Sequence, residues 1–215
     1  MDKMIFRDIH CADLPKIREI VGESWDWAYL FEKQEALEAT LGLYLNMALH
    51  KSSFTKVAVF NNQPVGVIMG YVKGDEPIGR LLMDDSALYA LMLLTATTKD
   101  RKAIYEYLSK TLNTYDRLLE MADIPYDASL VFLAVSKKVR GLNIGKHLWF
   151  ELLDYFKQRS VQSAYLFSDT ECNFGFYDHM GFTKRASLEA DFVFNGEPED
   201  FEQTIFLYDF QLDHP

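Results

Sequence analysis

Residues 131–146 read Val-Phe-Leu-Ala-Val-Ser-Lys-Lys-Val-Arg-Gly-Leu-Asn-Ile-Gly-Lys, and this stretch decides how the chain folds. An apolar run ends at Val135, a short basic loop follows, and an apolar helix pattern begins at Ile144. Backbone N–H groups in the first turn of a helix lack intrahelical partners, and the helix dipole favours an anion there. The order of strand, loop and helix therefore predicts a site for a phosphate-bearing ligand.

The basic residues of this loop stand out because the chain has a formal net charge of −10. They are Lys137, Lys138, Arg140 and Lys146. Two common phosphate motifs do not fit: a P-loop has four residues between its glycines, and the dinucleotide fingerprint needs three glycines. Gly141 and Gly145 are only two glycines with three residues between them. An ordinary strand-to-helix turn with surface lysines is the alternative interpretation.

The composition indicates a folded protein with a large core, since 49% of the 215 residues are hydrophobic. The acidic balance argues against nucleic acid and anionic membrane surfaces as partners. Cys11 and Cys172 are too few for a disulfide framework, and the first residues have no apolar signal core, so we expect a cytoplasmic protein. The longest apolar stretch, residues 88–96, is about half the ~20 residues that a membrane span needs.

Hydrophobic periodicity predicts a single mixed α/β domain over residues 1–215. The expected strands cover residues 4–9, 54–60, 65–72, 131–135, 163–167, 187–194 and 203–210. One expected helix starts with Asp13 as its cap, and three others cover residues 32–49, 144–156 and 171–179. Residues 78–122 contain no proline and no glycine after Gly79, which predicts a helical insertion of two or three helices.

A second motif follows the next expected strand: Asn173-Phe174-Gly175-Phe176-Tyr177-Asp178-His179-Met180-Gly181-Phe182. Together with Arg140-Gly141-Leu142-Asn143-Ile144-Gly145, it resembles the GNAT superfamily of acyl-CoA-dependent N-acyltransferases. That family has the signature Arg/Gln-x-x-Gly-x-Gly/Ala, and then an Asn followed by Tyr-x-x-x-Gly-Phe. Asn143 replaces the middle glycine, and asparagine is the side chain that best tolerates a positive φ. The resemblance is strong over residues 129–183.

The resemblance implies a central mixed, largely antiparallel sheet flanked by helices, with acetyl-CoA as the cofactor. The phosphates would bind the loop, the pantetheine arm would pair with the strand backbone, and Tyr177 would be the general acid for the leaving thiolate. The implied cofactor-binding residues are Leu133, Val135, Arg140, Gly141, Leu142, Asn143, Ile144, Gly145, Lys146, Asn173 and Tyr177. The alternatives are that Tyr177 is a packed core aromatic and Asn173 a helix cap.

In the implied reaction a primary amine attacks the thioester, and the amine must first lose its proton, because its pKa is ~10.4. The sequence leaves the base open between Asp127, Glu23 and Asp26. Cys172 has no His or Asp partner at a recognisable spacing, so a small buried thiol is the expected role rather than a covalent acyl-enzyme. The five histidines are scattered, and we expect no metal site.

The aromatic residues Trp25, Trp27 and Tyr29 are the candidates for the acceptor pocket, since the corresponding region lines the acceptor side in the family; a core edge is the alternative. The insertion at residues 78–122 either shapes that site or forms a subunit interface, as in a homodimer. The acceptor is a small-molecule or peptide amine, and the acidic charge favours a small cationic one. The rival functions are a non-catalytic acyl-CoA-binding sensor or interaction module, and an α/β protein without a cofactor.

Overall fold

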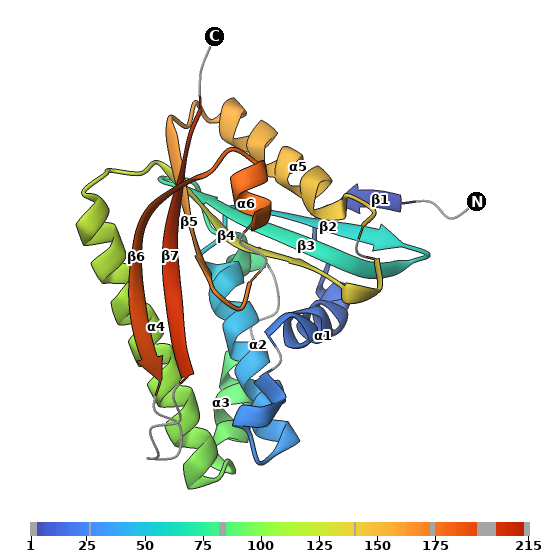
Figure 1. Cartoon of the computed structure of the whole chain (residues 1–215). Helices are drawn as coiled ribbons and strands as arrows, with labels where there is room; N and C mark the ends of the chain where they lie inside the picture. The colour runs from blue at the N-terminus through green and yellow to red at the C-terminus, as the bar shows by residue number, and fades with distance from the viewer. Residues whose placement is uncertain are drawn as a thin grey trace.

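The computed structural model describes residues 4–25, 27–81, 85–139, 141–172, 175–192 and 201–212. Its strands form one 7-stranded sheet in the order β1-β2-β3-β4-β5-β7-β6 (Figure 1). The strands are β1 (Met4–Arg7), β2 (Phe54–Phe60), β3 (Gln63–Val72), β4 (Ala128–Val135), β5 (Ser163–Asp169), β6 (Thr183–Phe192) and β7 (Phe201–Gln211). The neighbouring strands pair antiparallel except for β4 and β5, which are parallel. The prediction of a mixed, largely antiparallel sheet flanked by helices is confirmed.

Helices cover both faces of this sheet (Figure 1). They are α1 (Leu14–Trp25), α2 (Gln34–His50), α3 (Ser86–Leu94), α4 (Thr98–Ala122), α5 (Ile144–Gln158) and α6 (Gly175–His179). One buried cluster joins α1, α2 and α4 to the sheet, and a second joins α5 to the opposite face. No helix in the described part of the chain is long and apolar enough to cross a membrane.

The two cores arise from the period-2 alternation of side chains along each strand. On β3, Val67 and Met69 belong to the cluster under α1 and α2, whereas Ile68 between them belongs to the α5 cluster. On β7, Leu207 and Tyr208 face opposite clusters in the same way. Strands buried on both faces read as nearly continuous apolar runs, which is why these segments are easy to find in the sequence.

The helix pattern predicted for α5 is confirmed. Ile144, Leu148, Leu152 and Phe156 are all at most 3% exposed and face the sheet. The strand before it, β4, is the fourth of the seven in the sheet, so its central position is also confirmed.

Some predicted boundaries differ from the structure, for local reasons. The first strand ends at Arg7 and α1 begins at Leu14, because Asp13 belongs to a preceding 3₁₀ turn (Cys11–Asp13). Its carboxylate accepts the His10 N–H at 2.8 Å and pairs with Arg7 at 2.7 Å. The short helix predicted from residue 171 begins at Gly175.

The parallel pair is the feature that creates the site. β4 and β5 pair only at Ala128 with Ala164 and at Ser129 with Tyr165. Beyond those positions the strands diverge, and the two halves of the sheet open like a V (Figure 1). The predicted helical segment between β3 and β4 supplies α3 and α4, and α4 packs beside β6 and β7.

Candidate active site

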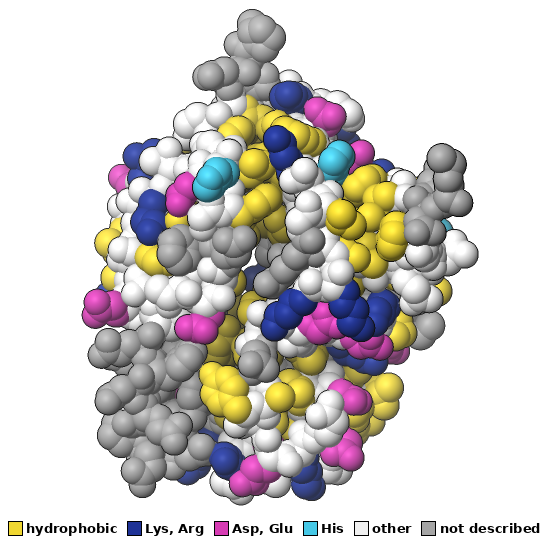
Figure 2. All heavy atoms as spheres, turned by 45° about the vertical axis from the view of Figure 1, so that its right-hand side comes forward, with side chains coloured by type: hydrophobic (Ala, Val, Ile, Leu, Met, Phe, Trp, Pro, Cys, Tyr) yellow, Lys and Arg dark blue, Asp and Glu magenta, His cyan; other side chains and the backbone are white. Residues whose placement is uncertain are grey.

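A cavity of about 960 Å³ fills the space between the diverging strands. Its wall comes from β4, the end of β5, the start of α5, α6, and the facing sides of α2 and α4. Figure 2 shows the surface hollowed near the middle of one face, with lysine and arginine side chains beside the hollow. Segments distant in sequence therefore meet around one space.

The loop before α5 forms one end of the cavity. Gly141 and Asn143 both have positive φ, 86° and 56°, and they turn the chain so that α5 starts against the cavity. The positive φ expected at Asn143 is present. The first-turn residues Gly145 and Lys146 line the cavity, where backbone N–H groups without helical partners suit an anion.

The predicted cofactor-binding residues at this loop and Asn173 of the second motif fall into three groups. The residues that line the cavity are Gly141, Asn143, Ile144, Gly145 and Lys146. Leu142 is 55% exposed and does not line it. Arg140 and Asn173 lie outside the described residues.

One edge of β4 is free where it borders the cavity. From Leu130 to Val135 this strand pairs with β3 on one side, but β5 has already diverged on the other. Leu133 and Val135, the residues predicted to hold a pantetheine arm, both line the cavity there. An extended ligand can therefore hydrogen-bond along this edge as an added strand does.

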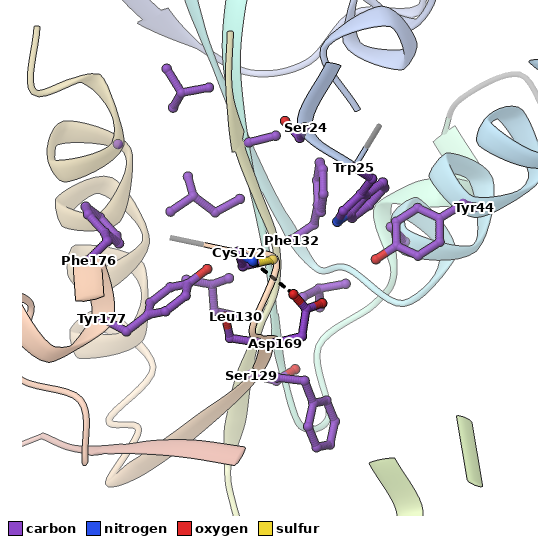
Figure 3. Close-up of a pocket in the computed structure, with 18 of the residues that line it drawn as sticks. Ser24, Trp25, Tyr44, Ser129, Leu130, Phe132, Asp169, Cys172, Phe176 and Tyr177 are labelled. Carbon is purple, nitrogen blue, oxygen red and sulfur yellow. Dashed lines mark hydrogen bonds between the residues drawn. The ribbon is translucent and has the colours of Figure 1, made fainter. Parts of the chain in front are cut away.

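Tyr177 projects from α6 into the cavity. Its ring packs against Phe176, Phe182 and Tyr208, with centroids 5.5 to 5.8 Å away. Its hydroxyl points toward Cys172 (Figure 3). Burial, and then the neighbouring Cys172 and Asp169 side chains, raise the pKa of Tyr177 well above its usual value, so the phenol stays protonated. Tyr177 thus both packs in the core and presents a donor to the cavity.

Asp169 ends β5 at the floor of the cavity, between Tyr177 and Tyr44 (Figure 3). Its Oδ1 accepts the backbone N–H groups of Glu171 and Cys172, each at 2.9 Å. This turn explains why α6 does not begin at residue 171. Asp169 is not among the residues predicted from the sequence, because a single aspartate at the end of a strand is typical of an ordinary turn.

Cys172 also lines the cavity. Burial, with the neighbouring charge of Asp169, raises the pKa of the Cys172 thiol to about 12. The group is therefore a neutral thiol near neutral pH, and a neutral thiol is a poor nucleophile.

Aromatic side chains form the other end of the cavity, a chamber between α1, α2 and α4. The ring centroid of Trp25 lies 4.6 Å from that of Tyr44 and 5.3 Å from that of Phe132. Trp27 stacks on Trp25, with ring centroids 5.0 Å apart. Of the three predicted acceptor residues, Trp25 lines the cavity, Trp27 supports it, and Tyr29 is 61% exposed and outside the lining.

The chamber includes three tyrosines that the sequence analysis missed, namely Tyr44 on α2 and Tyr107 and Tyr115 on α4. Burial raises the pKa of all three. They come from helices whose approach to β5 is a tertiary feature, and no local motif marks them.

Two of the three predicted base candidates make hydrogen bonds outside the cavity lining. Glu23 accepts the Ser136 hydroxyl at 3.0 Å, and Asp127 accepts the backbone N–H groups of Gln162 and Ser163 at 2.9 and 3.1 Å. Asp26 lies outside the described residues. Among the described lining residues, Asp169 is the carboxylate between Tyr177 and the aromatic chamber.

Comparison with known proteins finds the acetyltransferase (GNAT) family model over residues 112–182. No curated protein matches the chain. The loop before α5 and both sequence motifs fall within the matched segment.

Solved structures share the whole fold at low identity. A protein called SsHAT has a TM-score of 0.64 at 15% identity, covering 99% of this chain and 100% of its own. An agmatine N-acetyltransferase, solved as a mutant in its apo form, has a TM-score of 0.59 at 12% identity, covering 98% of this chain and 100% of its own. PaiA N-acetyltransferase from Thermoplasma acidophilum, solved with coenzyme A, has a TM-score of 0.52 at 15% identity, covering 98% of this chain and 99% of its own. The acetyltransferase (GNAT) family model therefore matches part of the chain, and the solved structures share the fold of the whole chain.

Proposed function

We propose that the protein transfers the acetyl group of acetyl-CoA to a primary amine, by direct attack within a ternary complex. The observation that carries this proposal is that one cavity joins a helix start whose N–H groups suit an anion, the free edge of β4 and the protonated Tyr177. Each part suits a different portion of one long ligand: the phosphates, the pantetheine arm and the thioester.

The order of these parts along the cavity sets the position of the thioester. With phosphates against Gly145 and Lys146, an arm running along Leu133 and Val135 brings its sulfur end toward Tyr177. Gly145 lies close to Phe176 of α6, since a Cβ at Gly145 would be in ordinary van der Waals contact with that ring, 3.5 Å away. The acceptor then approaches from the aromatic chamber, on the opposite side of Asp169.

Tyr177 is proposed to donate its proton to the departing sulfur. A thiol has a pKa of about 8.5 in water, well below the raised pKa of the Tyr177 phenol. If the leaving thiolate kept that pKa, proton transfer from Tyr177 to its sulfur would be unfavourable. The cavity changes that comparison, because the same surroundings hold the pKa of the Cys172 thiol near 12. The coenzyme A thiolate that leaves beside Cys172 meets the same desolvation, which raises its pKa toward that of the Tyr177 phenol.

The amine is proposed to reach the site as an ammonium held by Asp169, and to attack once it has lost its proton to water. A carboxylate orients an ammonium well, but it is a weak base toward a group of pKa ~10.4. The rate should therefore rise with pH as the neutral fraction of the amine grows.

The test of this function joins binding to turnover. We expect coenzyme A at about a hundred times its dissociation constant to stabilise the folded protein by about 2.7 kcal/mol, seen as a raised melting temperature. We also expect acetyl-CoA to release a free thiol, detected with a thiol reagent, when an amine is added. A thermal shift without thiol release for any amine would instead favour the non-catalytic acyl-CoA-binding module.

Direct transfer has its own test at Cys172. Replacing it as Cys172→Ala should leave kcat within a few-fold of the original, because a neutral thiol does not carry the acetyl group. Single-turnover mass spectrometry of the original protein with acetyl-CoA alone should show no acetylated chain. An acetyl adduct on Cys172, with activity lost in the variant, would mean a covalent acyl-enzyme.

A further inference from the structure

The cavity does not end at the reacting atoms. Beyond Asp169 it continues between α2 and α4, where the lining includes Met47, Leu108 and Leu112. Met47 and Leu112 are 38% and 40% exposed, so the cavity reaches the surface on this side as well as at Gly141. An acceptor can therefore enter opposite the loop that suits the phosphates, with its distal part held between the two helices.

The chemistry of this half is aromatic and apolar. Trp25, Tyr44 and Phe132 form one wall, with centroid separations of 4.6 to 6.1 Å. Tyr115 and Phe167, both in the lining, stack in parallel with centroids 3.9 Å apart. Flat rings of this kind bind apolar bodies, and their faces also attract a cationic head group.

The charges of the lining do not follow the charge of the whole chain. Among the described lining residues the charged side chains are Lys51, Lys146, Asp169 and Glu171. Two carboxylates and two ammonium groups balance, whereas the chain carries −10. Lys51 lies at the end of α2, next to the outer opening, where it would repel a second cationic group.

Taken together, these features select against polyamines. A diamine or polyamine reaching through the cavity would bring one ammonium to Asp169 and leave the next among aromatic rings and leucines, facing Lys51. Contact with the aromatic faces offsets only part of the cost of leaving an ammonium without a carboxylate partner in such surroundings. A molecule with one amine and an apolar body avoids this cost and fills the same space.

We propose that the acceptor is a primary monoamine with an aromatic or otherwise apolar body, with its head group at Asp169 and its body in the chamber between Tyr44 and α4. This inference rests on the proposed acetyl transfer and names its substrate class. It differs from the expectation, based on net charge, that the acceptor is a small cationic amine.

The test compares acceptors at fixed acetyl-CoA, with thiol release as the readout. We expect kcat/KM for 2-phenylethylamine and hexylamine to exceed that for putrescine and spermidine by about 10- to 100-fold, since a buried phenyl or alkyl group contributes that much. A lysine-containing peptide should be as poor as the polyamines. Equal or better turnover of polyamines or the peptide would overturn the monoamine proposal and leave acetyl transfer standing. No release with any amine would overturn both.

Two variants assign the roles. Asp169→Asn keeps an oxygen for the Glu171 and Cys172 N–H groups but loses the charge, so KM for 2-phenylethylamine should rise about 10-fold or more while KM for acetyl-CoA stays unchanged. Tyr44→Ala removes part of the aromatic wall and should lower the ratio of 2-phenylethylamine to putrescine turnover. Leu91→Ala on α3, where the leucine is 61% exposed and outside the cavity, is the control. An unchanged amine KM in Asp169→Asn and an unchanged ratio in Tyr44→Ala would contradict the assigned roles.

Discussion

Replacing the cavity's phenol as Tyr177→Phe should lower kcat by about 10²-fold or more, the usual contribution of a positioned proton donor. The affinity for coenzyme A should stay the same, because phenylalanine preserves the ring that packs on Phe176 and Phe182. Thiol-release kinetics measure kcat, and isothermal titration with coenzyme A measures the affinity. A matched control is Tyr105→Phe on α4, where the tyrosine is 74% exposed and outside the cavity.

The pH dependence separates the phenol from other groups. Because burial raises the pKa of Tyr177, its protonated form persists through the whole neutral and mildly alkaline range. The rate of the original protein should therefore rise with pH as the amine loses its proton, with no fall from ionisation of Tyr177 below pH ~10. Tyr177→Phe should keep the same rising limb at a lower level. Unchanged turnover of the variant at every pH would remove Tyr177 from the chemistry.

The strand, loop and helix proposed to hold the cofactor could be located from the sequence because their determinants are local. A buried strand, a loop with positive φ at Gly141 and Asn143, and a helix with one apolar stripe follow one another directly along the chain, each with its own pattern. The same holds for the hairpin of β2 and β3, whose strands flank a short polar turn.

The aromatic chamber, which is proposed to hold the acceptor, could not be predicted in the same way, because it is assembled from segments that are distant in the sequence. Tyr44, Phe132 and Tyr115 become neighbours of one cavity only once α2 and α4 pack beside the diverging strands. The net charge of the chain also does not describe the charge of the cavity, since the acidic residues do not gather in the described lining. Asp169 was overlooked for a third reason: a single aspartate at a strand end is ordinary turn chemistry.

The packing of α5 on the sheet should respond strongly to one added methyl group on β3. A Cβ at Gly70 would overlap the Leu152 side chain, which is fully buried between α5 and the sheet. Gly70→Ala should therefore lower the free energy of unfolding by about 1–3 kcal/mol, the usual cost of overpacking. Urea denaturation measures this change. Gly175→Ala is the control for adding a methyl group, since no atom of the described residues lies within 4 Å of that Cβ position.

A double-mutant cycle shows whether the clash is the cause and whether it reaches the active site. Leu152→Ala alone should cost about 2–5 kcal/mol by opening a cavity, but in combination with Gly70→Ala the two costs should fall short of their sum by about 0.5–3 kcal/mol. Because α5 also carries Gly145 and Lys146, a helix displaced by Gly70→Ala should bind coenzyme A more weakly, and the second substitution should restore part of that affinity. Additive stabilities with unaltered coenzyme A affinity would mean that the helix absorbs the methyl group without moving, and that the cofactor end is set by the loop alone.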